Sequence, residues 1–186
     1  MTVASVDRAK PSHRLFFGSW PTDAEREALG AVLPRLEWAS GGRRVPVGNY
    51  HLTLAFLGMV AATRLEVVKE AAAQVESPAA VIQLDRIEYW PKPQVLCLAA
   101  SETPLAVRSL AQELWQALAR IGFKPDVRPF KAHVTLARKV ERPPASHPVS
   151  PVAWPVGRLA LVESIGTPEG PAYTPLAFWP LTSSST

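Results

Sequence analysis

Two short segments of the chain carry nearly the same residues in the same order, and both contain side chains that can transfer protons. The first is His51-Leu52-Thr53-Leu54-Ala55 and the second is His133-Val134-Thr135-Leu136-Ala137. An unperturbed imidazole titrates near pH ~6.5, so one of two facing histidines can be neutral while the other is protonated. Such a pair can act as general base and general acid on opposite sides of one reacting atom.

The threonine of each segment adds a hydrogen-bond donor to this chemistry. Alternation along a strand places His51 and Thr53 on one face and the apolar residues between them on the other, and the second copy does the same. A threonine hydroxyl can donate to an oxygen that gains charge in the transition state. In-line substitution at phosphorus needs this set of groups: water activated on one side, the leaving oxygen protonated on the other, and the equatorial oxygens held.

The elements around the two segments must bring them together. Hydrophobic periodicity, capping boxes and turn residues predict the following order: a strand over 14–20, a helix from the capping box Thr22–Glu25 to about Trp38, a strand from His51 to Gly58, a helix from a second capping box Thr63–Glu66 to about Glu76, strands over 80–87 and 94–99, a helix over 104–121, the strand from His133, a proline-rich connection over 143–155, and strands over 157–165 and 173–181.

An apolar strand, a helix and then His-x-Thr-Leu-Ala therefore occur twice. Leu15 precedes His51 by 36 positions, and Leu96 precedes His133 by 37. We interpret this recurrence as an internal duplication. Two such halves packed about a pseudo-twofold axis would bring both His/Thr faces to one shared groove.

Composition limits the classes of protein that the chain can belong to. Its 186 residues fit one domain or two small lobes, and a net charge of +4 suits a phosphate-bearing ligand rather than a tail that coats nucleic acid. The one cysteine, Cys97, excludes an internal disulfide and any multi-cysteine zinc site, and its apolar neighbours predict burial. No apolar run reaches membrane-spanning length and no signal-peptide core is present, so we expect a cytoplasmic protein.

The two motifs and their flanks resemble the two-histidine (2H) phosphoesterase superfamily, nearest to its RNA 2′,3′-cyclic phosphodiesterase or 2′–5′ RNA ligase-like group. The similarity covers roughly 14–181, and it is carried by Arg14-Leu15-Phe16-Phe17, Asn49 to Gly58, Arg128-Pro129-Phe130, His133 to Arg138 and Leu159 to Ser164.

The resemblance implies a bilobal α+β fold in which two pseudo-twofold-related antiparallel sheets, with outer helices, frame a central cleft. We expect one such domain over 14–181, with a flexible leader over 1–13 and a flexible tail over 182–186. The implied reaction opens a 2′,3′-cyclic phosphate at an RNA end to a 2′-phosphate, without metal or cofactor, in a monomer.

Residue roles follow from the same resemblance. His51 is implied as the proton donor to the leaving 3′ oxygen and His133 as the base that activates water, although spacing alone leaves these two labels open. Thr53 and Thr135 are implied to bind the phosphate oxygens. The resemblance also implies Arg138 as a charged contact and Phe56 as a wall of the nucleoside pocket. Strand alternation, not the resemblance, puts Lys131 on the His133 face, where we expect it as an extra cation.

Two of these assignments carry a geometric condition. Phe56 and Arg138 each lie five positions after their histidine, so a straight strand would turn both away from the cleft. Their roles require that the strand twist, bulge or end before them. The sequence also departs from the family where Ala132, in place of a frequent proline, precedes the second histidine.

Simpler interpretations compete with the catalytic one. Arg14, Arg43 and Arg44 are expected to be surface charges rather than ligands, with a place along the cleft left open for each. Trp154 is expected to cap a groove. A module that only binds phosphorylated nucleotide ends, and a metal-dependent hydrolase with histidine ligands, remain alternatives. The sequence leaves the substrate open among tRNA fragments, 2′–5′ linked oligonucleotides, small cyclic nucleotides and a cyclic phosphate of ADP-ribose, and it leaves 2′–5′ ligation open as well.

Overall fold

The computed structural model describes residues 11–32, 42–126, 128–142, 149–168 and 170–182. Its strands are β1 (Ser12–Ser19), β2 (Arg43–Arg44), β3 (Leu52–Ala61), β4 (Ala80–Leu84), β5 (Arg86–Trp90), β6 (Val95–Ala99), β7 (His133–Arg138), β8 (Val152–Val156), β9 (Arg158–Thr167) and β10 (Gly170–Pro180). Its helices are α1 (Asp23–Val32), α2 (Leu65–Ala73) and α3 (Leu105–Arg120), with short 3₁₀ turns η2 (Val47–Asn49) and η3 (Ala62–Arg64).

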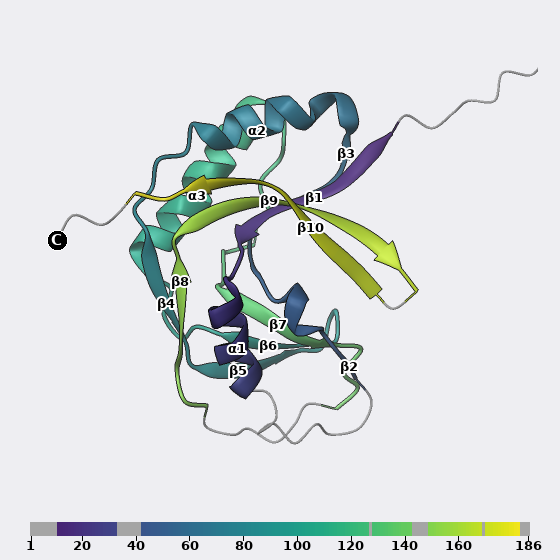
Figure 1. The fold of residues 1–186 in the computed structure, drawn as a ribbon, viewed down its shortest axis with the longest axis vertical. Coiled ribbons are helices and arrows are strands. Elements are labelled where there is room, and N and C mark those ends of the chain that lie inside the picture. Colours follow the sequence, from purple (N-terminus) through teal and green to yellow (C-terminus); the bar gives the residue numbers. More distant parts are fainter. Residues whose placement is uncertain (1–10, 33–41, 127, 143–148, 169, 183–186) are drawn as a thin grey trace, which may run out of the picture.

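Most strands form one antiparallel sheet that consists of two lobes (Figure 1). The first-motif lobe has the order β10-β9-β1-β3, and the second-motif lobe has the order β7-β6-β5, with β2 also paired to β7. The predicted α+β fold with two antiparallel halves is therefore confirmed. Strands β4 and β8 form a separate two-stranded sheet.

The two lobes are joined where the motif strands β3 and β7 meet. Leu52 and Val134 form the one residue pair in the register between these strands. Each of them follows the histidine of its own motif, and each is fully buried. The connection between the lobes thus lies at equivalent positions of the two motifs.

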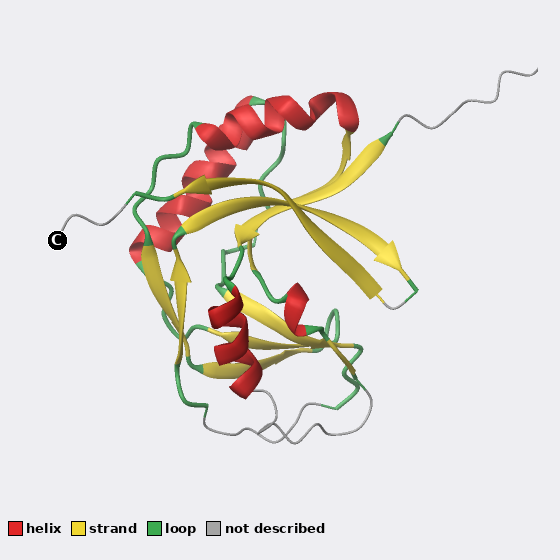
Figure 2. Cartoon of the chain, in the orientation of Figure 1, coloured by secondary structure: helices red, strands yellow, loops and turns green. Residues whose placement is uncertain are grey.

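Helices α2 and α3 lie together beside the first-motif lobe and contribute to the main core (Figure 2). Helix α3 presents Leu110, Leu114 and Leu118 to the interior, in line with the hydrophobic periodicity that predicts a helix over 104–121. It joins β6 and β7 of the second-motif lobe, yet it packs against β3 of the other lobe and against α2. The capping box that starts α1 is present: the Thr22 amide donates to Glu25 Oε2 (2.7 Å), and the Glu25 amide donates to Thr22 Oγ1 (3.4 Å).

The structure corrects several predicted boundaries. The strand from His51 does not end at Gly58 but continues to Ala61, because β1 pairs along its whole length with β3. β1 itself starts at Ser12, two residues inside the predicted leader. The second capping box does not form, because the η3 turn carries the chain into α2 and no side chain caps that helix. The predicted end of the first helix near Trp38 lies outside the described residues.

Two further predictions about strands are corrected. Strand β8 lies in the segment that the sequence predicts as a proline-rich connection, and the predicted strand over 80–87 is two strands, β4 and β5. Trp154 pairs with Ile82 across β8 and β4, and both are buried in the main core. The Trp154 indole donates to Ser19 Oγ (2.9 Å), so this residue caps no groove. Pro155 is tolerated because a two-stranded sheet has only edge strands. Asp85 separates β4 from β5.

Candidate active site

The junction of the lobes brings the four motif residues with polar side chains to one place. Since Leu52 pairs with Val134 in an antiparallel register, position 51 lies across from 135, and position 53 lies across from 133. Each histidine is thus opposite the threonine of the other motif. All four side chains are partly exposed, whereas the residues between them are buried. The sequence prediction that the two His/Thr pairs share one face agrees with this register.

Both imidazoles are held by the same hydrogen bond. His51 Nδ1 lies 2.7 Å from the carbonyl oxygen of Asn49, and His133 Nδ1 lies 2.8 Å from that of Lys131. Since a carbonyl only accepts, Nδ1–H is the donor in both rings. This bond fixes each ring through the residue two positions before it and leaves Nε2 as the nitrogen available for proton transfer. Asn49 also donates from Nδ2 to the Pro171 oxygen (2.7 Å), which ties η2 to β10.

His51 lies among aromatic rings of its own lobe. Its ring centroid is 4.6 Å from that of Phe16, 4.8 Å from that of Tyr173 and 6.0 Å from that of Trp20, which is nearly parallel to it. Burial lowers the pKa of His51 to about 4, and the positive charge of Arg138 lowers it further, against the opposing effect of the Asn49 carbonyl. In the free protein at neutral pH, His51 is therefore uncharged.

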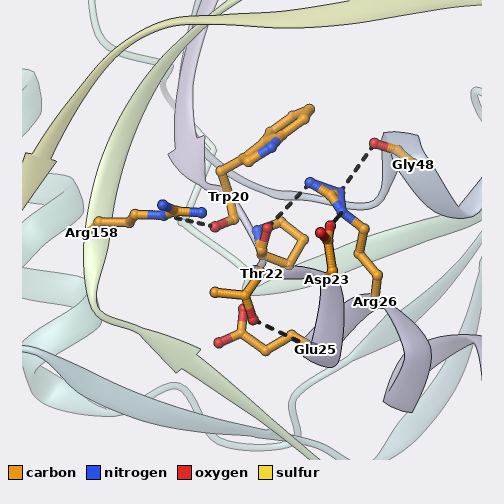
Figure 3. A network of polar contacts seen from close by, with 8 residues as sticks. Trp20, Thr22, Asp23, Glu25, Arg26, Gly48 and Arg158 are labelled. Carbon is orange, nitrogen blue, oxygen red and sulfur yellow. Dashed lines mark hydrogen bonds and ion pairs between the residues drawn. The ribbon is translucent and has the colours of Figure 1, made fainter.

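A polar network behind Trp20 supports this arrangement (Figure 3). Arg26 of α1 lies over the Trp20 ring at 5.1 Å and donates to the Gly48 oxygen of η2 (3.3 Å) and to the Pro21 oxygen (3.2 Å). The Trp20 oxygen accepts from Arg158 Nε (3.4 Å). Arg26 thus connects α1 to the turn that positions His51 and to the indole that stacks on it.

His133 has a different neighbourhood, with charged groups close by. The Trp90 ring lies 4.5 Å from it, and Glu88 accepts from Trp90 Nε1 (3.0 Å) and from Lys131 Nζ (2.6 Å). Burial lowers the pKa of His133, while the Lys131 carbonyl and the Glu88 carboxylate act in the opposite direction. Lys131 therefore lies beside His133 with its charge paired to Glu88, and its role as a substrate-binding cation stays a prediction.

Equivalent β-bulges bring Phe56 and Arg138 to the face of the histidines. In β3, Thr53 pairs with Gly18 and Ala55 with Phe17, so Leu54 is the extra residue. In β7, Thr135 pairs with Cys97 and Ala137 with Leu96, so Leu136 is the extra residue. Each bulge reverses the alternation that follows it. The geometric condition that the sequence set for both residues is met.

The pairing beyond each bulge shows where these two side chains lie. Phe56 pairs with Phe16, which contacts His51, and it is half exposed with the Arg14 guanidinium 5.2 Å from its ring centroid. Arg138 pairs with Val95, which in turn pairs with Trp90, the neighbour of His133. The positive charge of Arg138 lowers the pKa of both histidines. The charge of Arg138 thus acts electrostatically at both histidines.

Sequence reasoning missed the groups that surround the histidines, which are Phe16, Trp20, Glu88, Trp90 and Tyr173. None belongs to a motif, and each becomes a neighbour only through strand pairing or a turn. Phe16 and Trp20 had a weak signal, because both lie in the predicted strand over 14–20 and Phe16 is in a segment that carries the resemblance.

Other predictions concern metals, the cysteine and the membrane. Cys97 is fully buried, and burial raises the pKa of its thiol to about 12. Within the described ranges, no three side chains of His, Cys, Asp or Glu come together as a metal site would require. None of the helices in the described part of the chain is long and apolar enough to cross a membrane.

Comparison with known proteins agrees with this geometry. The family model described as LigT-like phosphoesterase matches two consecutive segments, 20–97 and 98–173, so each motif lies in its own match. The chain is 33% identical over 145 residues to an RNA 2′,3′-cyclic phosphodiesterase of Escherichia coli, with 76% of this chain and 81% of that protein covered. It is 31% identical over 173 residues to the protein of that name from Archaeoglobus fulgidus, with 88% and 97% covered.

A solved structure shares the fold as well. The crystal structure of E. coli LigT complexed with 3′-AMP superimposes with a TM-score of 0.85 at 30% sequence identity, and the match covers 93% of this chain and all of that one. Two matched segments, one motif in each, and the shared fold lead to one conclusion: the chain belongs to the LigT-like phosphoesterase family of the 2H superfamily.

Proposed function

We propose that this protein hydrolyses the 2′,3′-cyclic phosphate at RNA ends to a 2′-phosphate, with His51 and His133 as the acid–base pair. The observation that carries the proposal is the matched anchoring of the two imidazoles, which leaves both Nε2 atoms free at the junction of the lobes. The activity named for the relatives and the 3′-AMP bound to the E. coli structure support the choice of substrate.

In the proposed reaction, His133 accepts a proton from water as the water oxygen attacks phosphorus. The bond from phosphorus to the 3′ oxygen breaks, and His51 donates a proton to that oxygen. The product carries a 2′-phosphate and a free 3′-hydroxyl. Thr53, Thr135 and Arg138 hold the phosphate oxygens and stabilise their charge in the transition state.

The surroundings of the two histidines support this assignment of acid and base. Glu88 lies near His133, and a nearby carboxylate stabilises the imidazolium that forms when a base takes up a proton. Burial lowers the pKa of His51 to about 4, so once protonated it is a stronger acid than an ordinary imidazolium. The negative charge of the bound phosphate favours that protonated form.

We further propose that the enzyme acts as a monomer, without a metal, in the cytoplasm, where a single reduced cysteine is ordinary. A 5′-hydroxyl in place of water would undergo the same proton transfers and produce a 2′–5′ linkage. Ligation is therefore part of the proposal, and it is tested by adding an oligonucleotide with a free 5′-hydroxyl.

The test is hydrolysis of an oligonucleotide that ends in a 2′,3′-cyclic phosphate, with a chelator present and the product mapped as 2′- or 3′-phosphate. We expect a 2′-phosphate from the wild type and a loss of at least about 10²-fold in His51→Ala and in His133→Ala. His13→Ala is the matched control, since this histidine bonds Glu163 on β9 and has no role in the mechanism.

Three results would contradict the proposal. Tight binding without turnover would indicate the binding module instead. Activity that needs added metal would indicate the metal-dependent alternative, and equal activity in all three variants would remove both histidines from the mechanism.

A further inference from the structure

Two arginines at the edge of the site are direct cross-strand neighbours. Arg43 of β2 pairs with Arg138 of β7 in the antiparallel register. Side chains at paired positions point to the same face, and like charges directly opposite each other destabilise a sheet. Such a pair is retained at a cost in stability unless an anion lies between or beside the two groups.

The position of this pair in the sheet shows that it faces the site. Trp90, Val95, Arg138 and Arg43 form one row across β5, β6, β7 and β2. Since Trp90 contacts His133, the whole row lies on the face of the histidines. Arg43 is exposed and is farther from the histidines along this row than Arg138.

Within the described part of the chain, neither guanidinium is paired with a carboxylate. Among the residues that the structure describes, neither side chain has a hydrogen-bond partner. The Arg43 guanidinium lies against Gly170 at the start of β10, 3.3 Å from the point where a Cβ would be. Any side chain at position 170 would press on this group.

We propose that Arg43 binds the phosphodiester that links the last two nucleotides of the RNA end, while Arg138 contacts the cyclic phosphate. This subsite rests on the proposed function, and it makes an oligonucleotide a better substrate than a single cyclic nucleotide. Paired strand residues are about 5 Å apart at Cα, and two long side chains can diverge from there to reach successive phosphates. Guanidinium groups suit this role because they bind phosphate oxygens bidentately.

The experiment compares Arg43→Gln with wild type on three substrates. These are a mononucleotide 2′,3′-cyclic phosphate, a dinucleotide with the same end, and that dinucleotide with an uncharged methylphosphonate linkage. Arg108→Gln is the matched control, because Arg108 is an exposed arginine on α3 that donates to the Thr103 oxygen. Circular dichroism confirms that each variant is folded.

We expect Arg43→Gln to lower kcat/KM about tenfold on the native dinucleotide, the loss typical of one hydrogen-bonded charge contact. On the other two substrates the change should stay within about twofold, as for Arg108→Gln on all three. The slope of log kcat/KM against log salt concentration on the native dinucleotide should fall by about 0.7.

The subsite is disproved if Arg43→Gln lowers kcat/KM by the same factor on all three substrates. It is also disproved if the substitution changes kcat/KM on none of them while the wild type hydrolyses all three. Failure of the proposed function has a different signature, namely a wild type that hydrolyses none of them. In that case the subsite is tested without turnover. The equilibrium affinity is measured for a dinucleotide 3′-phosphate with the native phosphodiester linkage and with the methylphosphonate linkage. Equal affinity of wild type and Arg43→Gln for the native linkage overturns the proposal.

Discussion

Leu52 pairs with Val134, and each of these residues follows the histidine of its own motif. A pseudo-twofold axis through this pair relates the two motif strands. The pair is buried and apolar, so the attachment between the lobes also determines how the two imidazoles face each other. A substitution that displaces the backbone at this pair should therefore lower both stability and activity.

Gly18→Ala tests this dependence. A Cβ at position 18 would lie 2.5 Å from the Leu52 carbonyl oxygen, and that backbone is held by Ser19 on one side and Val134 on the other. We expect a loss of about 2 kcal/mol in the free energy of unfolding, as for overpacking in a core, measured by urea denaturation. Gly157→Ala is the control, because no atom lies within 4 Å of its added Cβ. Equal stability of the two variants would contradict the close approach.

The pKa of His51 predicts how stability depends on pH. Its pKa falls from the ordinary 6.5 to about 4 on folding, so below pH ~6.5 the unfolded chain binds the proton first. Stability is fully retained above that pH and declines as the pH falls towards 4. Between pH 7 and pH 4 the wild type should lose up to about 3 kcal/mol more than His51→Gln, which cannot take up this proton. If the free energies of unfolding of the wild type and His51→Gln, measured in urea, change with pH in parallel, burial does not shift the pKa of His51.

Glu88→Gln should lower the pKa of His133, since it removes the carboxylate that raises it. The imidazole C–H resonances in NMR report this pKa without any substrate. Glu163→Gln is the control, because Glu163 is a partly buried carboxylate bonded to His13 on β1. An unchanged His133 titration, or the same change in both variants, would remove Glu88 from the electrostatics of the site.

Cys97 should resist thiol reagents as long as the protein is folded. Its side chain is fully buried, and burial raises the pKa of the thiol to about 12, so the thiolate is scarce at pH 8. Alkylation followed by mass spectrometry should show reaction only after denaturant is added. Rapid modification of the native protein would mean that β6 opens in solution.

The sequence predicted the part of this site that is local and left out the part that depends on pairing. The order His-x-Thr-Leu-Ala identified both histidines and both threonines, because strand alternation alone puts them on one face. Phe56 and Arg138 could be assigned only on the condition of a bulge, since a bulge depends on the partner strand. Glu88 lies between Ile87 and Tyr89 with no motif around it, and its place beside Lys131 follows from the β5-β6-β7 order alone.

In the fold too, the sequence predicted the local features and missed those that depend on the pairing of distant segments. The amphipathic stripe of α3 and the capping box of α1 were predicted because their contacts lie within a few residues of one another. Strand β8 was missed because Pro155 within it and the prolines before it are typical of loops, and only its pairing with β4 in a two-stranded sheet makes Pro155 acceptable. The second capping box failed because a 3₁₀ turn, which the same residues also permit, precedes α2.

The two bulges also have a consequence for the direction in which a substrate lies. They place position five after each histidine on the shared face, and the residue there is Phe56 in one lobe and Arg138 in the other. A site with perfect twofold symmetry would accept an RNA end equally well in either of two opposite orientations. An aromatic ring at one end and a guanidinium at the other remove that ambiguity. In the proposed mechanism, the duplicated scaffold supplies both proton-transfer groups, and this pair of unlike residues decides which of them meets the leaving oxygen.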